Sequence, residues 1–368
     1  MVMEVLEAAQ RLESEGHNVI HLEVGEPDFE TPDCVKDAAK LAIDQGKTKY
    51  THSLGVYELR EAICEDYKKN YNVDIDPEQI IVTSGTSPGM LLCFGALLNP
   101  GDQVIISDPG YACYETFIKF ADGVPKRVKV YEDDGFQYEV LDIKKALNKN
   151  TKAIIINSPA NPTGTLLSKK KMQELAELDT YIVSDEIYHG LVYEGREHTI
   201  LEFTNKAFVL NGFSKKYAMT GWRLGYVIAP KDFVRCMRSL AQNLYICASS
   251  IAQYAAIAAL KYAEKDVLRM REVYNERRTY MIKRLRNMGF KIAVEPTGAF
   301  YILANAKKFT KNSYEFAFEV LKNSHVGVTP GIDFGENGEG FIRFSYANSI
   351  DNIKKGMDRI EGYLKSRY

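Results

Sequence analysis

The sequence predicts an α/β protein with a mostly parallel sheet between helices and a smaller α+β domain. Short apolar runs rich in β-branched residues alternate with helix-like segments through the middle of the chain, a pattern typical of parallel sheets buried on both faces. From about Lys231 to Met288 the pattern is mainly helical. The length of 368 residues also suits a large domain together with a smaller one.

The predicted strands share a short apolar run followed by a turn or a helical pattern. They are Ile80–Thr83, Gln103–Ser107, Lys152–Asn157, Tyr181–Ser184, Ala207–Asn211 and Leu224–Ala229. Helical patterns cover the acidic N-terminal segment, Pro88–Leu98, Tyr111–Ala121 and a segment from Ser168; the smaller domain has short strands near Phe300 and Ile342 and a closing helix from Ser349. Because such sheets bind ligands at the carboxyl ends of their strands, polar residues that follow these strands are the candidates for a site.

Composition and charge exclude several classes of protein. The net charge is −2, so no long-range field attracts nucleic acid or an anionic membrane surface. No stretch approaches the roughly 18 consecutive apolar residues that a membrane span needs, and the acidic N-terminus lacks the pattern of a signal peptide. The six cysteines form no C-x-x-C pair and the six histidines no H-x-x-H spacing. We therefore expect a cytoplasmic protein with reduced thiols, no metal site, and no nucleic-acid or membrane partner.

The segment Phe213–Tyr226 points most directly to chemistry. Lys215 follows a strand and a turn, in a stretch with little other charge, and Arg223 comes eight residues later between two glycines. A lysine in a loop is most often a solvated surface residue. Partial desolvation and a nearby cation would instead lower its pKa and free its amine as a nucleophile. Arg223 could supply that cation and also grip a phosphate with its planar guanidinium.

Two more strands are followed by candidate polar residues. Asp185 comes at the carboxyl end of an apolar strand, where its plain interpretation is a cap of a helix or turn. It could instead pair with the protonated ring nitrogen of a cofactor that acts as an electron sink. Tyr188 could offer its hydroxyl to the same ring. Asn161 lies in the turn Ser158–Gly164, whose prolines and glycine aim its amide at the strand ends.

Two further segments offer groups that bind anions. Thr83–Gly89 (T-S-G-T-S-P-G) joins a strand to a helix, an arrangement that presents free backbone N–H groups to a phosphate. Many strand–helix turns look the same, and the lysine of a Walker loop is missing. Arg343 alternates with apolar residues in Gly340–Tyr346, so it needs an anionic partner if it is buried. That partner is either a protein carboxylate or the α-carboxylate of a substrate.

Taken together, these segments resemble the class I/II, fold-type I aminotransferases that depend on pyridoxal 5′-phosphate (PLP), the aspartate aminotransferase family. The resemblance covers about Val19 to Ala347. It rests on the joint order and spacing of V-G-E-P-D-F-E-T-P (Val24–Pro32), K-Y-T-H-S-L-G-V-Y-E-L-R-E-A-I (Lys49–Ile63), D-P-G-Y-A-C-Y (Asp108–Tyr114), N-P-T-G (Asn161–Gly164), S-D-E-I-Y, S-K-K-Y-A-M-T-G-W-R-L-G, P-T-G-A-F-Y (Pro296–Tyr301) and P-G-I-D-F-G.

The resemblance implies a role for each matching position. Lys215, which directly follows a serine and precedes the arginine by eight residues, would carry the cofactor and shuttle the substrate Cα proton. The implied substrate contacts are Gly25, Asn161 and Arg343. The implied cofactor contacts are Asp185 with the pyridine nitrogen, Asn161 and Tyr188 with the ring oxygen, Tyr111 on the ring face, and Gly85, Thr86, Ser87, Ser214 and Arg223 around the phosphate.

The resemblance also implies a homodimer and a division into two domains. Tyr50 would reach the phosphate in the active site of the neighbouring subunit. The large PLP-binding domain would span residues 41–274, and residues 1–40 and 275–368 together would form the small domain. Gly212 departs from the pattern, because many members have a serine there that contacts the phosphate, a contact that Ser214 could replace.

The expected function is the transfer of an amino group from an L-amino acid to a 2-oxo acid by a ping-pong mechanism, as part of amino acid metabolism or biosynthesis. The expected donors are aspartate, glutamate or an aromatic amino acid, and the expected acceptor is 2-oxoglutarate. No arginine for a second substrate carboxylate stands out, so the donor side chain stays open. A carbon–sulfur β-lyase would use the same lysine, aspartate and arginines, and a non-catalytic protein on the same fold is a further alternative.

Overall fold

The computed structural model of the protein describes residues 2–367. Its α-helices, in chain order, are α1 (Val2–Ser14), α2 (Asp33–Asp44), α3 (Tyr57–Tyr71), α4 (Thr86–Leu97), α5 (Cys113–Phe120), α6 (Val140–Ala146), α7 (Lys169–Ala176), α8 (Lys231–Leu244), α9 (Ser250–Tyr262), α10 (Glu264–Met288), α11 (Ser313–Ser324) and α12 (Ile350–Arg367). Its strands are β1 (Ile20–His21), β2 (Ile80–Thr83), β3 (Gln103–Asp108), β4 (Val124–Lys129), β5 (Thr151–Asn157), β6 (Tyr181–Asp185), β7 (Ala207–Gly212), β8 (Gly225–Ile228), β9 (Tyr301–Asn305), β10 (Val326–Gly327), β11 (Thr329–Pro330) and β12 (Phe341–Ser345).

The main sheet has seven strands in the order β2-β8-β7-β6-β5-β3-β4. β8 runs antiparallel to both of its neighbours, and the pairs from β7 to β4 are all parallel. The predicted mostly parallel α/β sheet is therefore confirmed. The edge strand β4 is absent from the predicted set because its sequence, V-P-K-R-V-K, contains a proline and several charged residues, a composition common in edge strands.

Both faces of the main sheet are buried, which explains the continuous apolar runs in its strands. Along β5, Ile154 and Ile156 belong to one hydrophobic cluster, while Ala153 and Ile155 belong to another. Helices α3 and α9 contribute side chains to the first cluster, and α4, α5 and α8 contribute to the second. Because successive side chains of a strand point to opposite faces, the two clusters lie on opposite sides of the sheet. The packed sheet holds its carboxyl edge in a fixed place.

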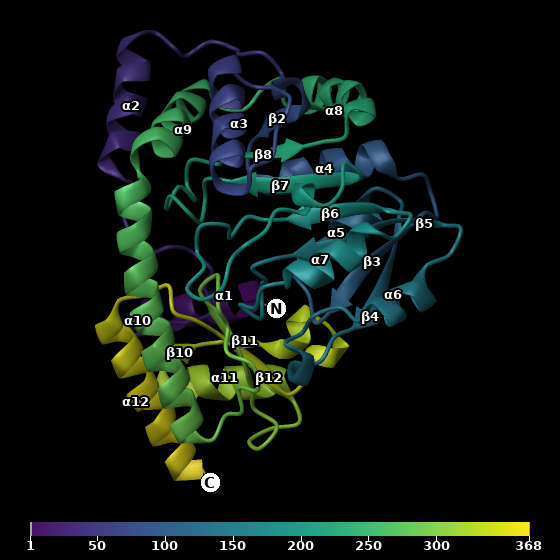
Figure 1. The fold of residues 1–368 in the computed structure, drawn as a ribbon. Coiled ribbons are helices and arrows are strands. Elements are labelled where there is room, and N and C mark those ends of the chain that lie inside the picture. The colour runs from purple at the N-terminus through teal and green to yellow at the C-terminus, as the bar shows by residue number, and fades with distance from the viewer. Residues whose placement is uncertain (1, 368) are drawn as a thin grey trace.

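The last third of the chain forms small sheets together with an N-terminal strand. β11, β12 and β9 form a three-stranded antiparallel sheet, and β1 pairs in parallel with β10. The long helix α10 runs along one side of the molecule from α9 toward these sheets, with α12 beside it (Figure 1). In β12, Arg343 lies opposite Leu303, and Ser345 lies opposite Tyr301. This register puts Arg343 and Tyr301 on the same face of the small sheet, diagonal to each other.

Three general features bear on the expected type of protein. No helix within residues 2–367 is long and apolar enough to cross a membrane. In the same part of the chain, no group of three or more histidine, cysteine, aspartate or glutamate side chains is arranged to hold a metal ion. All six cysteines are free, and burial raises the pKa of the Cys93 thiol far above its ordinary value. A buried, protonated thiol of this kind is chemically inert.

Candidate active site

A cavity of about 660 Å³ lies at the carboxyl ends of the parallel strands, beside the small sheet. Its walls come from loops after the main-sheet strands, from the segment that follows β1, and from the C-terminal third of the chain. The candidates from the sequence that line it are Gly25, Thr86, Ser87, Tyr111, Asn161, Asp185, Tyr188, Ser214, Lys215, Arg223 and Arg343. Gly85 lies directly before α4, next to Arg223. Tyr50 lies outside the cavity walls, with 80% of its surface exposed on this single chain.

Lys215 lies in the turn after β7 and projects into the cavity. Its Nζ donates a hydrogen bond to the carbonyl oxygen of Gly25 at 2.7 Å. Burial lowers the pKa of the Lys215 ammonium to about 8; Glu26 opposes this change, and Arg223 and Arg343 reinforce it. A substantial fraction of the amine is therefore neutral near pH 8, as a nucleophile or base must be.

The neighbouring lysine has different surroundings. Lys216 Nζ lies 3.9 Å from the Asp66 carboxylate and over the ring of Tyr217, on a side chain that does not line the cavity. Burial lowers its pKa, but Tyr217 and Asp66 outweigh that effect, so the net change is a raised pKa. Lys216 therefore stays charged, and Lys215 is the lysine suited to act as a nucleophile.

Asp185 ends β6 and lies at the floor of the cavity. Burial raises the pKa of its carboxyl to about 6, and hydrogen bonds from Tyr114 and from the Ile187 backbone oppose that rise. The Tyr114 hydroxyl donates to Oδ2 at 2.9 Å, and the Ile187 N–H donates to Oδ1 at 3.3 Å. Asp185 is therefore mostly an anion at pH 7 and above, held in a fixed orientation inside a low-dielectric site.

The N-terminus of α4 and the side chain of Arg223 meet at one end of the cavity. A Cβ on Gly85 would lie 2.9 Å from Arg223 Nη2, and Gly85 has φ +99°, so only glycine allows this approach without strain. A Cβ on Gly225 would lie 2.9 Å from the Gly85 carbonyl carbon and 3.0 Å from the Thr86 nitrogen. The first N–H groups of a helix and a guanidinium together form a site for a phosphate.

Arg343 projects from β12 into the other end of the cavity and is only 4% exposed. Its Nη1 donates to Asn161 Oδ1 at 2.9 Å, and its Nη2 donates to the Glu23 carbonyl at 2.5 Å and to Thr329 Oγ1 at 3.2 Å. All three acceptors are neutral groups, and the buried Nε has no partner in residues 2–367. A buried guanidinium without a matching carboxylate is suited to bind an anion that enters the cavity.

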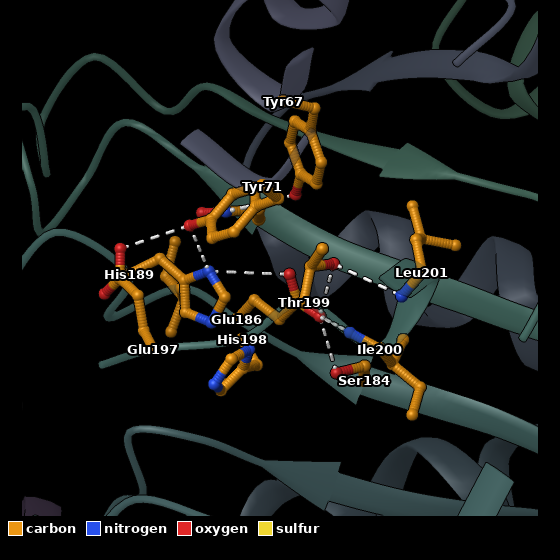
Figure 2. A network of polar contacts seen from close by, with 12 residues as sticks. Tyr67, Tyr71, Ser184, Glu186, His189, Glu197, His198, Thr199, Ile200 and Leu201 are labelled. Carbon is orange, nitrogen blue, oxygen red and sulfur yellow. Dashed lines mark hydrogen bonds and ion pairs between the residues drawn. The ribbon is translucent and has the colours of Figure 1, made fainter. Parts of the chain in front are cut away.

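A buried polar network (Figure 2) includes Glu186 and His189, which directly follow Asp185 and Tyr188 in the sequence. Glu186 Oε1 accepts hydrogen bonds from the Ser184 hydroxyl at 2.9 Å, from the Thr199 hydroxyl at 3.0 Å and from the Ile200 N–H at 3.0 Å. His189 Nδ1 lies 2.7 Å from the hydroxyl of Tyr71, which in turn donates to Glu197. Ser184, Glu186 and His189 thus belong to the network, whereas Asp185, Ile187 and Tyr188 line the cavity. The network holds the backbone that carries these cavity-lining side chains.

The family model for class I and II aminotransferases matches residues 17–360 of the chain. The chain belongs to this aminotransferase family. It is 44% identical over 367 residues to a (5-formylfuran-3-yl)methyl phosphate transaminase of Methanocaldococcus jannaschii. This alignment covers 99% of this chain and 96% of that protein. It is 41% identical to an aspartate aminotransferase of Pyrococcus horikoshii over 99% of this chain and 94% of the relative. The structure of an aromatic aminotransferase from the same species superposes with a TM-score of 0.93 at 39% identity, covering 98% of this chain and 99% of the other.

Membership of the aminotransferase family confirms the expected family, fold class and enzyme class. Aminotransferases of classes I and II depend on PLP, so the expected cofactor is confirmed as well. The roles of individual residues remain predictions. The relatives act on different substrates, according to their names: a furan aldehyde phosphate, aspartate, and aromatic amino acids.

Three residues at the aminotransferase site escaped the sequence analysis as individual candidates. Tyr114 lies in α5, three residues after Tyr111, whose ring it meets edge to face. It ends a motif that carries the resemblance, but the sequence alone gives no sign that its hydroxyl donates to Asp185. Tyr301 and Glu26 lie within quoted motifs but carry no local signal of function. Tyr301 reaches the cavity from β9, and Glu26 accepts a hydrogen bond from the Thr220 hydroxyl at the cavity wall.

Proposed function

We propose that this aminotransferase transfers the amino group of aspartate, glutamate or an aromatic amino acid to a 2-oxo acid, with 2-oxoglutarate as the acceptor, by a ping-pong mechanism. The observation that carries the proposal is the position of Lys215, whose pKa is lowered to about 8, in a cavity with separate anion-binding groups. The names of the aspartate and aromatic aminotransferases among its relatives support these donors.

The residues of the cavity fit PLP. The Gly85–Thr86 turn and Arg223 offer a seat for its phosphate, with Ser87 and Ser214 also at the cavity wall. Asp185 offers a buried carboxylate for the ring nitrogen. Asn161 and Tyr188 would hold the ring oxygen, and Tyr111 would cover the ring face. When bound, PLP supplies an electron sink that accepts the electron pair left on the substrate Cα.

The protein's own groups then divide the work between binding and proton transfer. Arg343, with Gly25 and Asn161, binds the substrate α-carboxylate and so orients the bond from Cα to its hydrogen. Lys215 would take up the substrate Cα proton as a base and give it back later in the cycle. Its depressed pKa lets it act in both directions near neutral pH. Asp185 would hold the protonated ring nitrogen through its carboxylate.

A second candidate acceptor is an aldehyde that carries a phosphate. The 44% identity to (5-formylfuran-3-yl)methyl phosphate transaminase over 99% of this chain favours it. In that case the guanidinium of Arg343 would receive the phosphate of the acceptor instead of a carboxylate, since a planar guanidinium binds either group through two hydrogen bonds. An assay with this aldehyde and with 2-oxoglutarate, using the same amino donor, would separate the two acceptors.

The remaining expectations from the sequence are part of the same proposal. We infer a cytoplasmic homodimer in which Tyr50 of each subunit reaches the phosphate in the other active site. The exposure of Tyr50 on the single chain supports this arrangement, because a tyrosine with 80% of its surface in water has no packing role within its own subunit. We also retain residues 41–274 as the large domain, and residues 1–40 with 275–368 as the small domain.

A spectroscopic comparison of two matched variants tests the proposal. Lys215→Met and Lys216→Met each remove one amine from adjacent positions and leave a side chain of similar length. With PLP, we expect the wild type and Lys216→Met to show the near-ultraviolet or visible absorbance band of lysine-bound cofactor, and Lys215→Met to lack it. L-glutamate, L-aspartate and L-tyrosine, added separately, should convert the band in the first two proteins and rank the donors.

The activity of Lys215→Met should fall by about 10²- to 10⁴-fold or more, as expected for the loss of a general base. If wild type lacks the band, both the assignment of Lys215 and the proposed aminotransferase mechanism are contradicted. A band that no amino donor converts, together with pyruvate and ammonia made from a cysteine conjugate without an acceptor, would favour the β-lyase alternative.

A further inference from the structure

Tyr301 is a cavity side chain that contacts both Tyr188 and Arg343. It starts β9, is 1% exposed, and still lines the cavity. Its hydroxyl lies 2.8 Å from the hydroxyl of Tyr188, and the two rings meet edge to face with centroids 5.7 Å apart. On the other side, the Arg343 guanidinium lies 4.5 Å from the centroid of the Tyr301 ring. Tyr301 therefore contacts one residue proposed to bind the cofactor and one proposed to bind the substrate.

The backbone around Tyr301 leaves its hydroxyl little freedom. A Cβ on Gly25 would lie 2.0 Å from the Tyr301 hydroxyl oxygen, so this oxygen is in van der Waals contact with the Gly25 backbone. The register of β9 against β12 holds the ring against Arg343. With the ring fixed between Gly25 and Arg343, its hydroxyl lies at a fixed distance from Tyr188.

The number of hydrogens available decides what the hydrogen bond between the two hydroxyls leaves for a ligand. A phenol hydroxyl has one hydrogen to donate. The hydroxyl of Tyr301 is the one protein partner of Tyr188 Oη recorded among the described residues. If Tyr188 donated to Tyr301, it would have no hydrogen left for a ligand in the cavity. If Tyr301 donates to Tyr188, the hydrogen of Tyr188 is free to point into the cavity.

The electrostatics of the pair favour the second arrangement. The Arg343 cation over the Tyr301 ring stabilises negative charge on that phenol and makes it the stronger acid of the two. Burial raises the pKa of both phenols. Arg343 and the bond to Tyr188 limit the rise for Tyr301; for Tyr188, the effect of Arg343 is smaller than that of the nearby Tyr301, which raises the pKa further. The stronger acid donates the hydrogen bond, so Tyr301 is the donor.

We propose that Tyr301 is a positioning residue of this aminotransferase: its hydroxyl donates to Tyr188 and thereby turns the Tyr188 hydrogen toward the cavity. There the Tyr188 hydrogen stabilises negative charge on the ring oxygen of the bound cofactor. The inference rests on the proposed role of Tyr188. It also links Arg343 to Tyr188, because an anion bound to Arg343 weakens the cation that makes Tyr301 the donor.

A pH titration of the absorbance of the PLP-loaded protein tests whether the Tyr301 hydroxyl acts through Tyr188. Tyr301→Phe keeps the ring between Gly25 and Arg343 and removes only the donor. We expect the pKa of the pH-dependent absorbance change to rise by roughly 0.5–1 unit, the effect of losing one oriented hydrogen bond. Tyr188→Phe should raise it at least as much. In the Tyr188→Phe background, Tyr301→Phe should add nearly nothing, because it acts only through Tyr188.

Tyr346→Phe is the matched control. The Tyr346 hydroxyl is also buried and donates to the Ala299 carbonyl at 3.2 Å, but its side chain does not line the cavity. This control should leave the absorbance titration unchanged. Equilibrium dialysis of PLP against each apoprotein gives a second readout. We expect Tyr301→Phe to bind PLP more weakly than wild type, and Tyr346→Phe to bind it with the wild-type affinity.

Three outcomes would overturn the inference. They are an unchanged titration in Tyr301→Phe, a full additional shift when Tyr301→Phe is combined with Tyr188→Phe, and the same shift in Tyr346→Phe. In each of these cases, the proposed function is still supported if wild type shows the absorbance band of lysine-bound cofactor. Loss of the lysine-linked band from wild type removes the proposed function and the inference together. Thermal unfolding midpoints of all variants establish that each is folded at the temperature of the titration.

Discussion

Lys215 and Asp185 line one cavity, and burial disfavours the charged form of each side chain. Burial lowers the pKa of the lysine to about 8 and raises that of the aspartate to about 6. Between these two values the aspartate is mostly ionised and the lysine mostly protonated. The working pH range of the protein is therefore expected near and above pH 7, where Asp185 is an anion and part of Lys215 is a neutral amine.

Glu26 is the acidic group that most strongly opposes the depression of the Lys215 pKa. Glu26→Gln removes that negative charge, so we expect the pKa of Lys215 to fall further, by up to about one unit. The rate at which the apoprotein captures PLP should rise with pH around a midpoint near 8 in wild type and around a lower midpoint in the variant.

Stopped-flow absorbance across a range of pH measures both midpoints. Glu30→Gln changes another exposed glutamate of the same loop and should leave the midpoint where it is. An upward shift in Glu26→Gln would contradict the assigned direction.

Asp185 is expected to make the apoprotein less stable at neutral pH. Its pKa rises from an ordinary value near 3.8 in the unfolded chain to about 6 in the folded protein. The folded state thus binds the proton more tightly, so the stability that Asp185 contributes falls as pH rises from about 4 to 6. Asp185→Asn removes this dependence. The variant should gain up to roughly 1–3 kcal/mol relative to wild type as pH rises through that window.

Urea unfolding of both apoproteins at pH 4.5, 6 and 8 measures this difference. A stability difference that is constant across pH would show that the carboxyl does not titrate with a raised pKa. The PLP-dependent activity of Asp185→Asn should at the same time fall by about 10²- to 10⁴-fold.

At the scale of elements, the proposed phosphate site depends on the close approach of β8 to the start of α4. Gly225→Ala would place a methyl group 2.9 Å from the Gly85 carbonyl carbon, whereas nothing lies within 4 Å of a Cβ at Gly221 in the same loop. Crowding of this kind costs about 1–3 kcal/mol. We expect Gly225→Ala to weaken PLP binding by roughly tenfold or more, and Gly221→Ala to change it less than about twofold.

Fluorescence titration of the two apoproteins with PLP compares these alanine variants directly. Equal affinities would show that the turn before α4 moves to accommodate the methyl group and does not fix the phosphate seat.

The elements of the main sheet were largely predictable because burial on both faces leaves a continuous apolar run in each central strand. The same reasoning fails for β4, whose mixed sequence reflects its place at an edge. It also cannot reveal that β8 runs opposite to its neighbours, since strand direction depends on how the connections pass through space. The polar residues that follow β2, β5, β6 and β7 do meet in one cavity, as the strand-end rule predicts.

The residues that escaped prediction depend on contacts between distant parts of the chain. Tyr301 acts on Tyr188 across 113 positions of sequence, and Tyr114 donates to Asp185 across 71. Each is a buried tyrosine in a chain that contains 23 tyrosines, and composition does not separate a packing tyrosine from a polar one. Only the folded arrangement shows which hydroxyls face a functional group.

At the scale of the whole molecule, the proposed homodimer predicts complementation between damaged subunits. Lys215→Met leaves Tyr50 intact, and Tyr50→Ala leaves Lys215 intact. A hybrid dimer of the two variants would contain one site with both residues and one site with neither. We expect mixing, by unfolding and refolding together, to restore activity well above that of either variant alone.

Sedimentation should find the wild type and both variants as dimers. If the mixture is no more active than the sum of its parts while hybrids are present, Tyr50 does not serve the neighbouring site. Mixing Lys215→Met with Asp185→Asn is the control. Both residues belong to the same subunit's site, so no hybrid restores a complete one.

The hydrogen bond from Arg343 to the Glu23 carbonyl has a consequence for the order in which the cavity walls form during synthesis. Glu23 leaves the ribosome long before Arg343, so the wall that they share closes only after Arg343 has also emerged. The main-sheet strands, which are contiguous in sequence from residue 80 to residue 228, can pair before that moment. A nascent chain at that stage would thus have Lys215 exposed on a formed sheet without Arg343, the residue proposed to bind the substrate carboxylate. If both residues have their proposed roles, capture of the cofactor would precede binding of the amino donor by the time needed to translate the segment from β8 to Arg343.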